Sequence, residues 1–123
     1  MFKDIVDRFE KDVNGALTTL LVLGIIIEGQ RVWTYQIKQR FRILTNQTDN
    51  IPTSSLYAML NKLETMYGLI TSEKDEVVQR RFYLPTKDSL LQYQRLQDYW
   101  FQLMDKSRET LASLQIKQNV PSR

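Results

Sequence analysis

Residues 53–85 read TSSLYAMLNKLETMYGLITSEKDEVVQRRFYLP, and this stretch decides the fold. In its first half, apolar residues recur at three- and four-residue steps: Leu56, Met59, Leu60, Leu63 and Tyr67. That spacing predicts a helix with one buried stripe, beginning at Thr53 or Ser54 and ending near residue 67. Gly68 follows immediately, where a helix favours a left-handed C-terminal cap.

The second half of the stretch predicts a two-stranded hairpin. Residues 69–72 form a short apolar strand, Lys74-Asp75-Glu76 a polar turn, and residues 77–84 a second strand. Pro85 ends that strand, because proline has no N–H to donate to the ladder.

The first segment of the chain also has the pattern of a helix. Its apolar stripe consists of Phe2, Ile5, Val6, Phe9, Val13, Leu17, Leu20, Leu21 and Gly24. Asn14-Gly15 either divides this segment into two helices or only weakens one. The run 20–27 is apolar on every side, as in a core helix, and Glu28-Gly29 ends it.

A second helix is predicted from Thr34, as its N-cap, to about Leu44. Its inward positions are Tyr35, Ile37, Phe41 and Leu44. Residues 45–52 are polar and read as a loop.

A long final helix is predicted over residues 88–116, capped by Thr86 or Asp88. Residues 117–123 form a flexible tail. The expected domains are an N-terminal extension that supports a dimer (1–15), a winged-helix domain (16–87), a dimerisation helix (88–116) and the tail.

The composition excludes several classes of function. The chain has 123 residues, enough for one modest core, and contains no cysteine and no histidine. Disulfides, zinc fingers and Cys or His catalysis are therefore ruled out, and no cofactor or metal is expected. We expect a soluble cytoplasmic domain, because no secretory signal opens the chain and the apolar run 16–27 is too short to span a bilayer.

Positive charge is concentrated in the middle of the chain. The net charge is +3 overall, but −2 over residues 1–29, +4 over 30–87 and +1 over 88–123. Three helices followed by a hairpin form a winged helix-turn-helix, in which the third helix enters the DNA major groove. The expected fold is therefore mainly α with a small β-hairpin, a winged helix-turn-helix with a long C-terminal dimerisation helix.

The predicted DNA-binding residues lie on the second and third helices and the wing. Small side chains allow close approach, Asn61 can pair with adenine, and the cations can hold phosphates. The set is Thr34, Gln36, Thr53, Ser54, Ser55, Tyr57, Ala58, Asn61, Lys62, Lys74, Arg80 and Arg81. Alternatively, Arg80 and Arg81 protect an edge strand or pair with Asp75 and Glu76. Because strand residues alternate, only one of the two arginines should face DNA.

Roughly residues 16–105 resemble the PadR-like winged-helix transcriptional regulators. The likeness is carried by residues 20–29 (LLVLGIIIEG), 35–38 (YQIK), 55–64 (SLYAMLNKLE), 68–70 (GLI), 80–83 (RRFY) and Thr86. The interval from Leu63-Glu64 to Gly68 is one residue longer than is usual in that family. The resemblance implies a cytoplasmic homodimer that represses or otherwise modulates transcription at a palindromic operator, with the first and last helices forming the dimer interface.

The sequence supports a dimer independently, because an exposed apolar helix face favours a partner. The predicted interface is Phe2, Ile5, Phe9, Leu96, Tyr99, Trp100, Leu103, Met104 and Leu111. Some relatives bind planar aromatic compounds between the dimer's helices, and Tyr99 and Trp100 are the candidates for such a small aromatic effector here.

The leading hypothesis is thus a DNA-binding transcriptional regulator. A winged-helix module that binds protein without DNA is the alternative. An enzyme is the weakest hypothesis, because the acids do not form a paired constellation in one predicted cleft.

Overall fold

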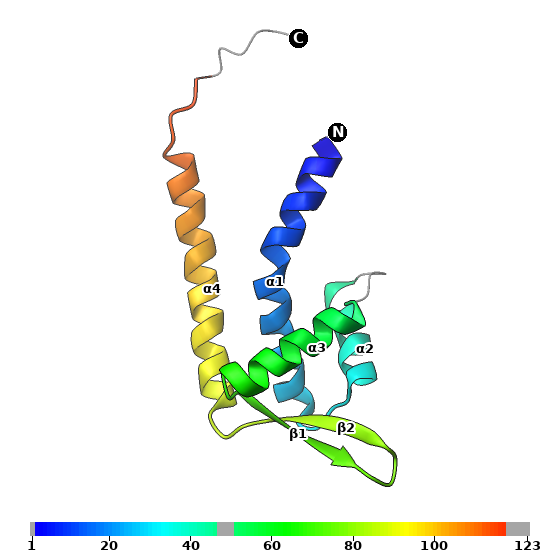
Figure 1. The fold of residues 1–123 in the computed structure, drawn as a ribbon. Helices are drawn as coiled ribbons and strands as arrows, with labels where there is room; N and C mark the ends of the chain where they lie inside the picture. Colours follow the sequence, from blue (N-terminus) through cyan, green and yellow to red (C-terminus); the bar gives the residue numbers. More distant parts are fainter. Residues whose placement is uncertain (1, 47–50, 118–123) are drawn as a thin grey trace.

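A computed structural model describes residues 2–46 and 51–117, except for the side chains of residues 2–4, 7 and 11. The elements follow the predicted order of helix, helix, helix, hairpin and long helix (Figure 1). They are α1 (Phe2–Gly29), α2 (Thr34–Thr45), α3 (Thr53–Asn61), the π-helix η1 (Lys62–Met66), β1 (Ile70–Asp75), β2 (Arg80–Pro85) and α4 (Ser89–Ala112). The predicted tail beyond residue 117 and loop residues 47–50 lie outside the described residues.

The core joins the second half of α1 to α2, α3, η1 and the hairpin. Its buried side chains are Val22, Leu23, Ile25, Ile26, Val32, Ile37, Ile51, Leu56, Leu60, Leu63, Leu69, Ile70 and Tyr83. The predicted stripe of Leu56, Leu60 and Leu63 is confirmed. On α2 only part of the prediction is right: Ile37 is buried and Phe41 packs against the core, but Tyr35 and Leu44 are exposed.

α1 is a single helix that continues through Asn14-Gly15. Its window Asp12–Gly29 has a mean hydropathy of 1.4 over 18 residues, long and apolar enough to cross a membrane by length and composition. The expectation that this segment is too short is therefore wrong as a statement about length. Ile26 and its apolar neighbours in that window lie in the protein core, and core helices of soluble proteins commonly have such a composition.

α2 begins differently from the prediction. Trp33, and not Thr34, is the extended N-cap residue, and Thr34 is the first helical residue. The Trp33 backbone N–H donates to Gln36 Oε1 at 3.1 Å, which satisfies one donor of the helix start.

The third helix changes its winding before it ends. α3 gives way at Lys62 to η1, in which the Tyr67 N–H donates to the Lys62 carbonyl oxygen at 3.1 Å, a π-type step of five residues. A π-helical turn accommodates one extra residue, so it explains the long interval before Gly68. Gly68 has φ 64°, as predicted for a left-handed cap.

The hairpin is present, but its turn is displaced. β1 and β2 pair antiparallel from Ile70↔Pro85 to Asp75↔Arg80, so the turn is residues 76–79 and not 74–76. The Val77 and Val78 N–H groups donate to Asp75 Oδ1 at 2.9 and 3.3 Å, so Asp75 organises a turn that begins after it. Val32 adds a bridge to Tyr83 on the other side of β2.

α4 packs along α1 and is anchored to the hairpin at its start. Ser89 is fully buried, its Oγ contacts the Leu69 carbonyl oxygen, and it accepts the Thr86 N–H at 2.8 Å. At Gly24 of α1, an added Cβ would lie 3.0 Å from the Tyr93 ring, so glycine allows the two helices to approach. Beyond this contact, the first half of α1 and the second half of α4 project away from the hairpin (Figure 1).

Candidate nucleic-acid interface

α3 turns a small, polar surface away from the core. Thr53, Ser54, Tyr57, Ala58 and Asn61 are exposed, and Ser55 is half-buried. Because no large charged side chain lies among them, a base edge or a phosphate can approach the helix closely. This is the surface that we call the recognition face.

α2 supplies a cation to the start of the recognition face. Lys38 Nζ donates to Thr53 Oγ1 at 2.7 Å. The first N–H groups of α3 lie beside it, and helix N-termini favour anions. Lys38 therefore joins the candidate phosphate-binding groups, although the sequence pattern indicated only ordinary surface there.

The wing has two chemically different faces. Directly paired residues of an antiparallel hairpin share a face, so the register places Lys74 with Arg81 on one face and Glu73 with Phe82 on the other. The first of these, which also carries Ser72 and the buried Tyr83, we call the cationic face of the wing.

The opposite face of the wing carries the acids Glu73 and Asp75, and Arg31 of the same chain neutralises both. Arg31 Nε lies 2.9 Å from Glu73 Oε2, and Arg31 Nη2 lies 3.2 Å from Asp75 Oδ2. The Arg31 guanidinium also lies 3.7 Å from the centroid of the Phe82 ring. The Val78 N–H, with further help from the Val77 N–H and Arg31, holds the pKa of Asp75 below its ordinary value against the opposing effect of burial. Both carboxylates thus have partners, so they oppose a polyanion less than free acids would.

A groove of about 460 Å³ separates the wing from the helices. It is lined by Trp33, Thr34, Tyr57, Gln79, Arg80, Arg81 and Tyr83. The Arg80 guanidinium stacks 3.9 Å from the centroid of the Trp33 ring. Both arginines line this groove, although the register places them on alternate faces of the hairpin. That only one of them faces DNA stays a prediction.

Arg81 is held by a chain of hydrogen bonds that reaches the end of the third helix. Arg81 Nη1 lies 3.1 Å from Ser72 Oγ, which in turn lies 3.2 and 3.1 Å from the two carboxylate oxygens of Glu64. Burial raises the pKa of Tyr83; Tyr57 and Glu64 add to the rise and Arg81 opposes it. The alternative that Arg80 and Arg81 pair with Asp75 and Glu76 is not what the described residues show, because Arg31 is the partner of Asp75.

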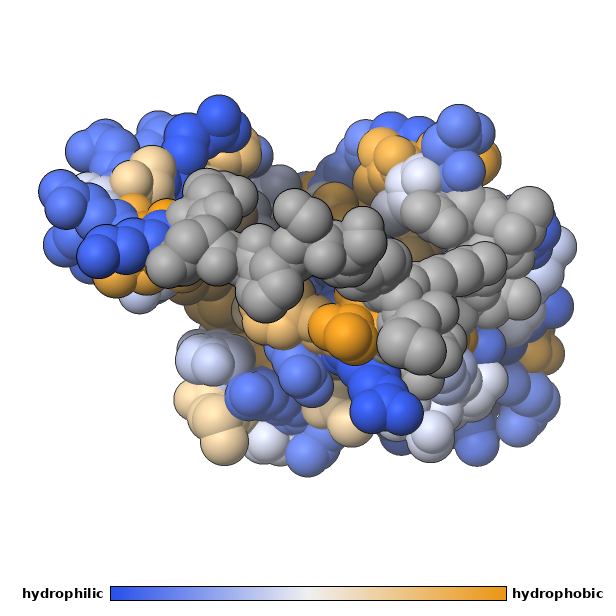
Figure 2. Space-filling view, turned by 90° about the horizontal axis from the view of Figure 1, so that it is seen from above, coloured by the Kyte–Doolittle hydropathy of each residue, from blue (hydrophilic) through white to orange (hydrophobic). Residues whose placement is uncertain are grey.

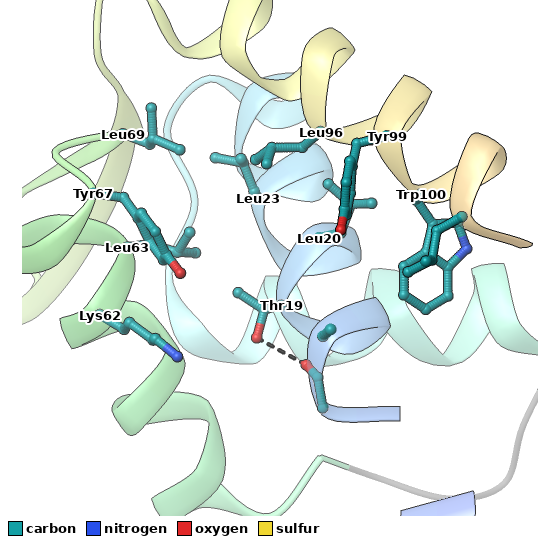
Figure 3. Close-up of a pocket in the computed structure, with 13 residues that line it drawn as sticks. Thr19, Leu20, Leu23, Lys62, Leu63, Tyr67, Leu69, Leu96, Tyr99 and Trp100 are labelled. Carbon is teal, nitrogen blue, oxygen red and sulfur yellow. Dashed lines mark hydrogen bonds between the residues drawn. The ribbon is translucent and has the colours of Figure 1, made fainter. Parts of the chain in front are cut away.

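A second, larger groove lies on the other flank of η1, between α1 and α4 (Figure 3). Its volume is about 510 Å³. The lining residues are Gly15, Ala16, Thr19, Leu20, Leu23, Lys62, Leu63, Tyr67, Leu69, Leu96, Tyr99, Trp100 and Leu103. We call this the interhelical groove; it contains both candidate effector residues, Tyr99 and Trp100.

Much of the projecting helix surface is apolar and exposed. Figure 2 looks onto the ends of α1 and α4 and shows hydrophobic surface among the hydrophilic side chains. The exposed residues include the predicted interface members Ile5, Phe9, Leu96, Tyr99, Leu103, Met104 and Leu111, whereas Trp100 is half-buried. The side chain of Phe2 lies outside the described residues.

Comparison with solved structures supports this architecture. A transcriptional regulator from Clostridium thermocellum, Cth-833, matches 80% of this chain and 93% of its own at 27% identity, with a TM-score of 0.68. A PadR family transcriptional regulator from Eggerthella lenta matches 90% and 92% at 24% identity, with a TM-score of 0.72. The chain has a PadR-like winged-helix fold. The circadian clock associated protein Pex from Anabaena, at 17% identity, 88% and 98% coverage and a TM-score of 0.57, shares that fold. No family sequence model and no curated protein sequence matches the chain.

Within this PadR-like fold, two of the predicted DNA-binding residues lie elsewhere or have another role. Lys62 lines the interhelical groove together with Leu63 (Figure 3). Gln36 accepts a hydrogen bond at the start of α2. The position of Lys62 favours a role in the interhelical groove, and its phosphate contact stays a prediction.

The other predicted residues lie on the recognition face, the wing or the groove between them. Sequence reasoning missed Lys38 and Arg31, whose contacts involve residues 15 to 44 positions away. The sequence signal that could have identified Lys38 was its positive charge at an outward position of the second helix. Among the described residues, no group of three or more acidic side chains could hold a metal ion.

Proposed function

We propose that the chain is a sequence-specific DNA-binding transcriptional regulator that represses from a palindromic operator as a homodimer. The observation that carries the proposal is that one groove is lined by Tyr57 of the recognition face and by the wing arginines Arg80 and Arg81. Cations neutralise phosphates and provide affinity, while small polar side chains on the helix provide base contacts. The described acids of the wing that lie nearest, Glu73 and Asp75, already have Arg31 as a partner.

The homodimer follows from the exposed apolar surfaces of the projecting helices. Phe9 on α1 and Leu111 on α4 are 66% and 68% exposed, a costly arrangement for a soluble monomer. A second copy related by a twofold axis would cover both surfaces. The two recognition faces would then meet half-sites about 34 Å apart, one turn of DNA. Residues 1–15 and 88–116 would serve the dimer, residues 16–87 would bind DNA, and the protein would act in the cytoplasm.

The test is selection of binding sites from a random DNA pool, followed by affinity measurements at several salt concentrations. We expect a palindromic site and a log–log salt slope of several units, about 0.9 per phosphate contact. Asn61→Ala should relax the preference at one base pair, while Lys62→Ala should weaken binding to all sequences if Lys62 contacts a phosphate and leave it unchanged if Lys62 serves only the interhelical groove. Absence of DNA binding at low salt would overturn the proposal and favour the protein-binding module.

The interhelical groove supports a second role, as the site of a small aromatic effector. Its lining is mostly apolar: leucines, with the rings of Tyr67, Tyr99 and Trp100. It shares Leu96, Tyr99, Trp100 and Leu103 with the proposed dimer surface, so an effector would lie between the helices of the dimer.

The effector role can be tested by fluorescence. The chain contains two tryptophans, so a Trp33→Phe variant reports on Trp100 alone. Saturable quenching by a planar aromatic compound, lost in a further Ala16→Phe variant that fills the groove from an exposed position without adding a tryptophan, would support the role. Quenching that does not saturate, or that persists in the filled groove, would contradict it.

A further inference from the structure

We infer that Glu64 is a positioning residue for DNA binding: it holds Arg81 in place through the hydroxyl of Ser72. This inference rests on the proposed DNA-binding function and assigns a role to an acid in a region that otherwise attracts anions. The three side chains come from three elements, since Glu64 lies on η1, Ser72 on β1 and Arg81 on β2.

The direction of the hydrogen bonds is fixed by the chemistry of the groups. A guanidinium can only donate and an ionised carboxylate can only accept. Ser72 Oγ therefore accepts from Arg81 Nη1 at 3.1 Å and donates its one proton toward Glu64, whose oxygens lie at 3.1 and 3.2 Å. The hydroxyl thus transmits the attraction of a carboxylate to a guanidinium with which, among the described residues, that carboxylate forms no direct ion pair.

Arg81 needs such a restraint because of its neighbour across the hairpin. Lys74 is its direct partner in the register, and like charges in opposed positions repel. An arginine side chain also has many rotamers, and fixing them has an entropic cost when it meets a phosphate. If Arg81 is already held in one conformation in the free protein, less side-chain entropy is lost when DNA binds.

Glu64 can set this position because its own backbone is anchored. Its neighbour Leu63 is 2% exposed and packs in the core, and the Leu69 N–H donates to the Leu63 carbonyl oxygen at 2.9 Å. The same turn follows directly from the recognition face of α3. The hydrogen bonds through Ser72 therefore fix the position of Arg81 relative to the helix that would contact the bases.

The test measures whether DNA affinity rises or falls when a negative charge is removed. Removing a negative charge near DNA should strengthen binding if charge alone matters. If Glu64 positions Arg81, Glu64→Gln should instead weaken operator binding about three- to tenfold, because a neutral amide oxygen accepts the Ser72 proton more weakly than a carboxylate does. Glu76→Gln is the matched control, because Glu76 is an exposed acid in the wing turn whose backbone carbonyl, not its side chain, accepts a hydrogen bond from Gln79. This control should bind as tightly as the parent or more tightly.

Ser72 provides a test at constant charge. Ser72→Ala should weaken binding to a similar extent and lower the salt slope by up to about 0.9, as for one lost phosphate contact. Ser72→Thr keeps the hydroxyl and should restore both values. In an Arg81→Ala background, Glu64→Gln should no longer weaken binding, because the arginine that it positions is absent.

A measurement on the free protein separates this inference from the proposed function. The NMR order parameter of the Arg81 Nε–H bond should fall in Ser72→Ala and in Glu64→Gln but not in Glu76→Gln. Unchanged order in the first two variants would overturn the inference whether or not the parent binds DNA. A parent that binds DNA and a Glu64→Gln variant that binds more tightly would overturn it while leaving the DNA-binding function intact.

Discussion

The two halves of α1 both carry large apolar side chains, but these side chains have opposite surroundings. In the second half, Leu23 and Ile26 are fully buried by α2, α3, η1 and the hairpin of the same chain. In the first half, Ile5 and Phe9 are more than 60% exposed among the described residues. The winged-helix head (the second half of α1 with α2, α3, η1 and the hairpin) is packed within one chain, whereas the projecting helices expose apolar side chains that the proposed second copy would cover. Because only the projecting helices are proposed to associate, measurements at different protein concentrations can distinguish their contribution to stability from that of the head.

The largest expected effect is in the head. Ile26→Ala removes a fully buried side chain and should lower the free energy of unfolding by about 2–5 kcal/mol. Urea unfolding at a concentration too low for dimerisation would measure it. Ile5→Ala, in the exposed half of the same helix, should change that free energy by less than about 0.5 kcal/mol. Equal losses in both variants would contradict the division of α1.

The next effect is on association. Phe9→Asp combined with Leu111→Asp should raise the dimer dissociation constant about 100-fold or more, because each change occurs twice in a twofold interface. Sedimentation equilibrium would measure the constant. Val77→Asp, at a 92% exposed position in the wing turn, is the control and should not change it. A parent that remains monomeric at high concentration would remove the basis of the comparison.

A smaller effect concerns the contact where the two regions meet. Gly24→Ala should destabilise the chain by about 1–3 kcal/mol, because the new Cβ would lie 3.0 Å from the Tyr93 ring. Gly15→Ala, in the same helix with nothing within 4 Å of the added Cβ, should stabilise it by about 0.5–1 kcal/mol. Thermal unfolding of both variants would show opposite shifts, and equal shifts would mean that α4 does not pack on α1 at Gly24.

The main features of both regions were predictable from the sequence. The head follows from local patterns: the spacing of Leu56, Leu60 and Leu63 places the third helix, and Gly68 ends it at the predicted position. The exposed faces of α1 and α4 also follow from the residue pattern, since each helix carries an apolar stripe longer than a core of this size can cover.

What failed depended on contacts between distant residues or on small local energies. Tyr35 and Leu44 have the right character for burial, but the core is filled by Ile37 and Phe41 of the same helix. The site of the hairpin turn was decided by Asp75, whose side chain accepts two backbone N–H groups. That Lys62 lines the interhelical groove is likewise a feature that no local sequence pattern indicates.

The smallest expected effect is a pH dependence confined to the head. The pKa of Asp75 is lowered on folding, chiefly by the Val78 N–H, so the unfolded chain binds its proton more tightly than the folded chain does. Its contribution to stability is therefore fully present above its unfolded pKa of about 4 and is lost as the pH falls through the lower folded value. The thermal midpoint of the parent should fall more between about pH 5 and pH 3 than that of Asp75→Asn. Both slopes should be independent of protein concentration, because Arg31, Val77 and Val78 belong to the same chain as Asp75.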